Sequence, residues 1–147
     1  MTTDSHAAAE FARHFPKIAG SLSAEQLGIL LNGATMQEIA AGRTLIRDRM
    51  PVDCLYFLLD GEFGVYIEIE GKAKRIATAH PGEWLGEVSV LSGEFKASAT
   101  VIADTDGRVM RIHHKSFESL IAQNEAIAKV LLDQFIELMA ARLRGYA

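Results

Sequence analysis

The segment from Pro81 to Gly93 contains residue types that could bind a small anionic ligand. Within it, Gly86 precedes Glu87 to Leu91, a short stretch with a helical pattern. Backbone N–H groups in the first turn of a helix bind anions, and the helix dipole favours negative charge there. The Glu87 carboxylate would accept a hydrogen bond from a ligand hydroxyl group, and Gly86 would let the backbone come close. The alternative interpretation is an ordinary turn followed by a helix cap.

Other kinds of site find little support in the residues. The single cysteine, Cys54, excludes an internal disulfide and an iron–sulfur site within one chain, and we expect it to be a small buried residue. His113 and His114 are adjacent, so on a strand they would face opposite sides and could not chelate one ion. No Gly-X-Ser-X-Gly motif is present. We therefore expect no enzyme activity, no metal site and no obligatory cofactor.

The elements that would position the segment are helices at both ends of the chain and strands between them. Ala7 to Phe15 is expected to be helical up to Pro16, and Ser23 with Gln26 forms a capping box. From about residue 35 to residue 112, alternating apolar residues predict strands. Four turn sequences divide this region, and such close spacing predicts an antiparallel sandwich or barrel. They are Asp60-Gly61, which predicts a β-hairpin, Glu70-Gly71-Lys72, His80-Pro81-Gly82 and Asp104-Thr105-Asp106-Gly107.

Over roughly residues 15–143 the sequence resembles the cyclic-nucleotide-binding domain of catabolite-activator-type transcription factors, cyclic-nucleotide-dependent kinases and gated channels. Pro81 to Gly93 resembles the phosphate-binding cassette of that family, and Gly42, Leu45-Ile46, Leu55-Tyr56-Phe57 and Gly61 match its first strands and first sharp turn. The resemblance implies a mainly β fold with flanking helices (α+β). This fold is an antiparallel β jelly-roll with N-terminal helices, a short cassette helix and C-terminal helices. One domain would span residues 1–147, with helices at about 1–33, the β-roll at 34–112 and helices at 113–147.

The resemblance also implies which residues bind a cyclic nucleotide. Glu87 would accept a hydrogen bond from the ribose 2′-hydroxyl, and Ser98 matches a position that contacts the phosphate in many members. The purine is met by the terminal helix, where Arg142 is a weak candidate; a solvated cation at the helix end is the alternative. The expected ligand-binding residues are Gly86, Glu87, Val88, Ser89, Lys96, Ala97, Ser98 and Ala99.

The sequence departs from the family at the arginine that holds the phosphate. Counted forward from Glu87, Lys96 occupies its position; counted back from Ser98-Ala99-Thr100-Val101, Ala97 does. A guanidinium binds phosphate through two parallel donors, whereas an ammonium is a flexible point charge. Loss of the arginine would weaken nucleotide binding by about 10- to 150-fold. Two hypotheses stay open: a pocket for cAMP or cGMP, and a degenerate module that binds no nucleotide and acts in protein interaction or dimerisation.

Composition and charge limit the location and the partners. Fifteen basic and nineteen acidic residues give a net charge of −4, which does not suit coating nucleic acid. No stretch reaches the roughly 18 apolar residues that span a membrane, and no signal peptide is visible. Only Arg144 to Ala147 follow Leu143, too few for a helix-turn-helix domain. We expect a cytoplasmic chain that binds neither membrane nor, alone, DNA.

The last predicted helix, Glu125 to Leu143, carries more apolar residues than one buried face accommodates. They are Ile127, Val130, Leu131, Leu132, Phe135, Ile136, Leu138, Met139 and Leu143. The surplus predicts a homodimer through this helix, or another protein partner. The function expected from the whole sequence is therefore a non-enzymatic, ligand-sensing regulatory module that relays binding to its C-terminal helix.

Overall fold

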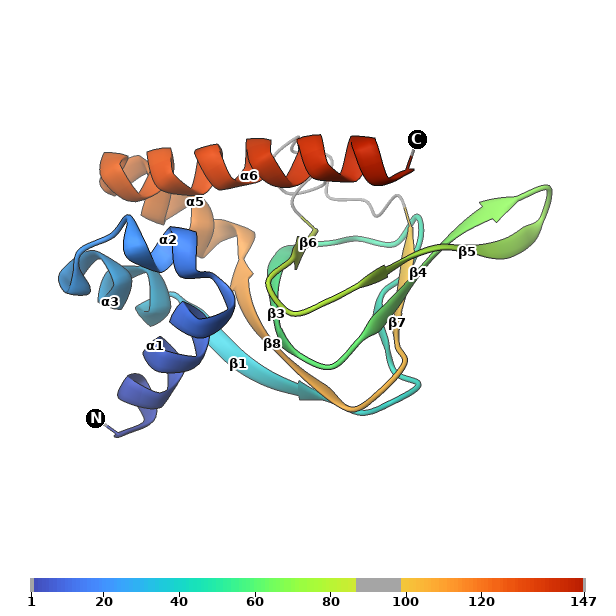
Figure 1. Ribbon diagram of the computed structural model, residues 1–147, viewed down its shortest axis with the longest axis horizontal. Coiled ribbons are helices and arrows are strands. Elements are labelled where there is room, and N and C mark those ends of the chain that lie inside the picture. The colour runs from blue at the N-terminus through green and yellow to red at the C-terminus, as the bar shows by residue number, and fades with distance from the viewer. Residues whose placement is uncertain (1, 87–98, 147) are drawn as a thin grey trace. The chain divides into compact units, whose positions relative to one another are not determined.

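The computed structural model describes residues 2–86 and 99–146, which form two compact units (Figure 1). A helical unit consists of Met1–Thr35 and Ile112–Ala147, and a β unit consists of Met36–Arg111. The expected cassette helix, Glu87 to Leu91, lies outside the described residues. The expectation of one domain over residues 1–147 stays a prediction.

Two four-stranded sheets make up the described strands. Their orders are β1-β8-β3-β6 and β2-β7-β4-β5, so each sheet joins strands that are distant in the sequence. The pairs β2–β7, β3–β6, β4–β5 and β4–β7 are antiparallel. The strands are β1 (Ala34–Ile39), β2 (Thr44–Ile46), β3 (Cys54–Asp60), β4 (Phe63–Ile69), β5 (Lys72–Ala79), β6 (Trp84–Leu85), β7 (Thr100–Ala103) and β8 (Gly107–His113). The predicted antiparallel jelly-roll with flanking helices is confirmed.

Side chains from both sheets form one core in the β unit. Leu58 on β3 and Val109 on β8 belong to this cluster with Phe63 on β4, and all three are fully buried. Burial fades along β4, because Val65 is buried whereas Ile69, at the far end, is 44% exposed. Burial therefore declines from one end of β4 to the other and does not alternate along the strand.

The turn sequences Glu70-Gly71 and Asp60-Gly61 both pair an acidic residue with glycine, but their structures differ. Glu70 and Gly71 connect β4 to β5 in a hairpin with Ile69 opposite Lys72, and both have positive φ angles, as a type I′ turn requires. The hairpin predicted at Asp60-Gly61 is wrong, because β3 and β4 pair in different sheets. Gly61 instead lies against the turn before β8: a Cβ there would be 2.7 Å from the Asp106 carbonyl oxygen.

The helical unit has local signals that match its helices. The predicted capping box is confirmed, since Ser23 accepts from the Gln26 N–H at 3.1 Å and the Gln26 side chain accepts from the Ser23 N–H at 2.8 Å. Pro16 ends the first helix, as expected, and also begins the second. Lys17 and Glu137 connect α2 to α6 through an ion pair of 2.7 Å. The helices are α1 (Thr2–His14), α2 (Pro16–Gly20), α3 (Ala24–Asn32), α5 (His114–Gln123) and α6 (Glu125–Tyr146).

Candidate functional site

The structure describes only part of the predicted ligand-binding set. Gly86 and Ala99, at its two ends, are described. Arg142 lies in α6, but its side chain is not among the described ones. The other predicted residues lie outside the described residues, and their roles stay predictions. They are Glu87, Val88, Ser89, Lys96, Ala97 and Ser98.

Gly86 is packed against the backbone of β3. Its φ angle is +83°, and a Cβ at this position would lie 2.5 Å from the Cys54 carbonyl oxygen and 3.2 Å from Val52 Cγ1. Any other residue would therefore combine an unfavourable backbone conformation with a collision. The sequence assigned this glycine to close approach of a ligand, whereas its contacts in the described structure are with the protein itself.

Ala99, at the other end of the predicted set, directly precedes β7, which pairs with β2. Thr100 begins β7, and its Oγ1 accepts a hydrogen bond of 3.0 Å from the backbone N–H of Asp48. Ile46 of β2 lies opposite Val101 of β7, with an irregularity in the register between Thr44 and Ile46. Irregularities of this kind re-aim side chains and are common near functional sites.

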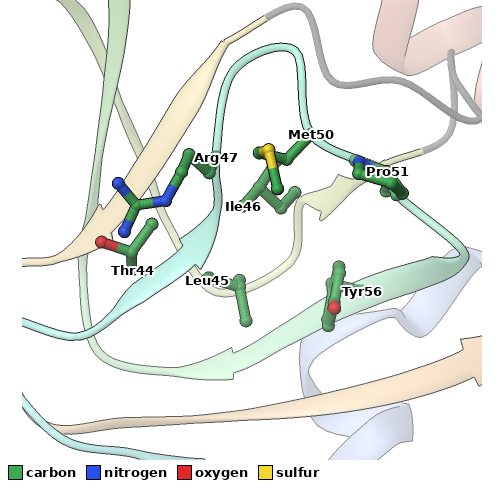
Figure 2. A pocket seen from close by; sticks show the side chains of 8 residues that line it. Thr44, Leu45, Ile46, Arg47, Met50, Pro51 and Tyr56 are labelled. Atoms are coloured by element: carbon green, nitrogen blue, oxygen red, sulfur yellow. The ribbon is translucent and has the colours of Figure 1, made fainter.

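A pocket of about 260 Å³ is lined by residues from β2, the loop after it and β3 (Figure 2). Val52 lines it and also contacts the position of Gly86, while Tyr56 lines it and lies opposite Leu85, the residue before Gly86. At the other end, Arg47 lines the pocket next to Asp48, which binds Thr100. The lining residues are Thr44, Leu45, Ile46, Arg47, Met50, Pro51, Val52 and Tyr56.

The pocket combines apolar walls with a few polar groups. Figure 2 shows the Arg47 guanidinium and the Thr44 hydroxyl toward one side of the view, and Pro51 and Tyr56 toward the other. Burial, followed by the effects of Cys54 and Asp53, raises the pKa of the Tyr56 phenol to about 12, so this side chain is a neutral hydrogen-bonding group at neutral pH. Apolar walls with a few convergent polar groups are typical of small-ligand pockets.

The sequence analysis assigned no ligand-binding role to any of these lining residues. Thr44, Arg47 and Tyr56 all precede the cassette in the sequence and come from β2, the loop after it and β3. The signal that could have found Arg47 was the lost cassette arginine, because its absence directs the search to arginines elsewhere in the chain.

The cysteine and the possible metal-ligating side chains were the other candidates for a functional site. Cys54 is buried, as predicted, and this burial, together with the neighbouring Asp53, raises the pKa of its thiol to about 11. It is therefore a protonated, unreactive thiol at neutral pH. In residues 2–86 and 99–146, no group of three or more His, Cys, Asp or Glu side chains could hold a metal ion. Across the same residues no helix has the length and apolarity to span a bilayer.

The chain belongs to the cyclic nucleotide-binding domain family, whose model matches residues 36–124, and this confirms the resemblance found in the sequence. The cAMP-activated global transcriptional regulator CRP of Salmonella typhimurium is 32% identical over 102 residues, 69% of this chain and 47% of that protein. The cAMP-dependent protein kinase regulatory subunit of Aspergillus fumigatus is 32% identical over 90 residues, 60% of this chain and 21% of that protein.

A solved structure shows the same fold over most of the chain. A cyclic nucleotide-binding domain from Methylobacillus flagellatus superimposes with a TM-score of 0.80 at 22% identity and covers 91% of this chain and 80% of that one. The chain spans between 21% and 47% of the length of the curated relatives that it matches. The family match and the shared fold identify a domain of the cyclic nucleotide-binding type.

Proposed function

We propose that this module senses cAMP or cGMP in the cytoplasm, without enzyme activity, by binding the nucleotide at the Gly86-Glu87 cassette. The observation that supports this most strongly is the pocket of about 260 Å³: its lining residue Val52 contacts Gly86, and its lining residue Ile46 pairs with Val101, two residues after Ala99. This volume is just below the roughly 300–1,000 Å³ of complete small-ligand pockets. We therefore assign to it one part of the nucleotide.

The roles proposed for the cassette follow from the chemistry of a cyclic nucleotide. Backbone N–H groups after Gly86 would bind the phosphate, with Ser98 and either Lys96 or Ala97 at the returning end. Glu87 would accept the hydrogen bond of the ribose 2′-hydroxyl. The remaining members of the set, Val88, Ser89 and Ala99, would shape the cassette around the ligand, and Arg142 is the weaker candidate for contact with the base.

The proposed output is a change in the C-terminal helices that a partner senses. α6 leaves Leu132 54% exposed and Ile136 58% exposed. These residues are four positions apart, so they lie on one face of the helix. We propose that this face pairs with the same face of a second copy, and that nucleotide binding shifts the population of helix arrangements. By this scheme the chain by itself would not bind DNA.

The same face of α6 favours a second candidate function. In this alternative the pocket has lost its nucleotide with the cassette arginine, and the chain acts as an interaction or dimerisation module. The two functions differ in what they require: the first needs both the pocket and α6, whereas the second needs only α6.

Calorimetry of a Glu87→Ala variant tests the first function. Removing the acceptor of the 2′-hydroxyl should weaken cAMP or cGMP binding at least about tenfold. A 2′-deoxy nucleotide should show the same loss with the unchanged protein. Glu68→Ala, which removes an exposed carboxylate on β4, is the matched control and should bind normally. The ribose is not held by Glu87 if neither Glu87→Ala nor the 2′-deoxy nucleotide lowers the affinity measured for the unchanged protein and the unmodified nucleotide.

A further inference from the structure

Arg47 is a cation in the β unit whose guanidinium has no partner in the described structure. It is exposed, and no hydrogen bond, ion pair or ring contact engages its side chain within residues 2–86 and 99–146. Arg75, on β5, is the opposite case: it pairs with Asp104 through two contacts, of 3.0 Å and 2.5 Å, and also donates to Tyr66 and Thr78. Arg75 is thus engaged by other side chains, whereas Arg47 has no such contact among the described residues.

The position of Arg47 relates it to the missing cassette arginine. The next residue, Asp48, donates its backbone N–H to Thr100 Oγ1 at 3.0 Å. Thr100 follows the two candidate positions for the lost arginine, Lys96 and Ala97, by four and three residues. Arg47 therefore lies beside the strand that returns from the position where the family keeps its phosphate-binding guanidinium.

The surroundings of Arg47 fit a phosphate that is attached to a larger organic body. Its side chain lines the pocket together with apolar residues such as Leu45 and Met50, and the Thr44 hydroxyl lies on the same side of the view in Figure 2. A guanidinium presents two parallel donors to phosphate oxygens, and a hydroxyl can add a third. The apolar walls would contact the rest of the ligand.

We infer that Arg47 binds the phosphate of the nucleotide from outside the cassette and replaces the absent cassette arginine. This inference rests on the proposed nucleotide-binding function and adds to it the residue that supplies the compensating charge. Arg47 directly follows β2, so the compensating charge would come from a part of the chain about fifty positions before Lys96 and Ala97. With Arg47 in this role, the protein would lose less affinity for the nucleotide than it would if nothing replaced the cassette arginine.

Calorimetry with an Arg47→Gln variant tests this assignment. The variant should bind the preferred cyclic nucleotide about ten- to hundredfold more weakly, because it loses a charge-assisted hydrogen bond. Arg47→Lys should retain part of the affinity, since an ammonium keeps the charge and loses the two parallel donors. Arg43→Gln removes the same charge from an exposed residue four positions earlier that does not line the pocket, and it should bind within about twofold of the unchanged protein.

Adenosine or guanosine distinguishes a phosphate contact from a structural role. Neither nucleoside carries a phosphate, so the unchanged protein and Arg47→Gln should bind each nucleoside equally. The melting temperature of Arg47→Gln should also be unchanged. Equal binding of the cyclic nucleotide by both proteins would overturn the role of Arg47 and leave the proposed function standing, as would a loss of nucleoside binding as large as that of the nucleotide. If the unchanged protein binds neither cAMP nor cGMP, the proposed function and this inference both fail.

Discussion

The β unit and the helical unit offer two different kinds of functional surface. In the β unit, a pocket carries a few polar groups in its lining, and its lining residue Val52 contacts Gly86. In the helical unit, the distinctive feature is apolar: Leu132 and Ile136 are more than half exposed on α6. A pocket with a few polar groups suits a small ligand, whereas an exposed apolar face suits a protein partner. Ligand binding and association can therefore be disrupted separately.

The largest effect is expected from a glycine at the edge of the pocket. Gly86→Ala should lower the free energy of unfolding by about 2–4 kcal/mol, because left-handed strain adds to a collision with the Cys54 carbonyl. Gly71→Ala is the matched control: its φ angle of +80° is similar, but nothing lies within 4 Å of the new Cβ. It should lose only about 1–2 kcal/mol. Urea denaturation measures both, and equal losses would show that Gly86 has no tight contact.

Association should depend on the exposed face of α6. Replacing Leu132 and Ile136 together by glutamate should convert a homodimer into monomers, because two charges would be buried in an apolar interface. Light scattering should then give a mass near 16.1 kDa. Ala126→Glu places a charge at an exposed position elsewhere on the helix and should leave the dimer intact. A monomeric unchanged protein at micromolar concentration would contradict the dimer and favour a different protein partner.

Restoring the cassette arginine should strengthen nucleotide binding and decide the sequence register. If Lys96 occupies the phosphate position, Lys96→Arg should tighten binding by up to about tenfold, whereas Ala97→Arg should do so in the other register. Calorimetry with both variants measures the difference, and Lys72→Arg, far along the β4–β5 hairpin, is the control for an added guanidinium. If neither substitution tightens binding, the phosphate is not held at this part of the chain.

The last expected effect is absent at neutral pH: a loss of stability at alkaline pH that originates beside the pocket. Burial raises the pKa of Cys54 from 9.0 to about 11 and that of Tyr56 from 10.0 to about 12. Above pH 9 the unfolded chain loses these protons before the folded chain does, so the free energy of unfolding should fall between pH 9 and pH 12. Cys54→Val should make the fall shallower. A pH-independent free energy over this range would contradict the burial of both groups.

The sequence predicted elements whose signals are local. The capping box at Ser23 and the turn at Glu70-Gly71 were predictable because each is formed by residues within a few positions of one another. Asp60-Gly61 carries an equally strong hairpin signal, yet Gly61 packs against Asp106, 45 positions later. The strands before and after Gly61 join different sheets, and a local pattern does not record such a long-range contact.

The candidate site shows the same limit. Its cassette could be predicted because Gly86 and Glu87 belong to a long, specific motif. Arg47 was missed because its link to the site is the hydrogen bond between Asp48 and Thr100, a contact between segments 52 positions apart. Pairing of β2 with β7 brings these segments together, and pairing between distant strands depends on the whole sheet.

Titration of the unchanged protein with cAMP and with cGMP in a calorimeter tests the central claim most directly. A pocket that uses the cassette and Arg47 predicts saturable binding of at least one of the two nucleotides, with one site per chain. The affinity should fall as salt is added, because a charged phosphate is being held by a cation. Absence of binding by both nucleotides, from protein that melts cooperatively, would contradict nucleotide sensing and leave α6-mediated interaction as the function.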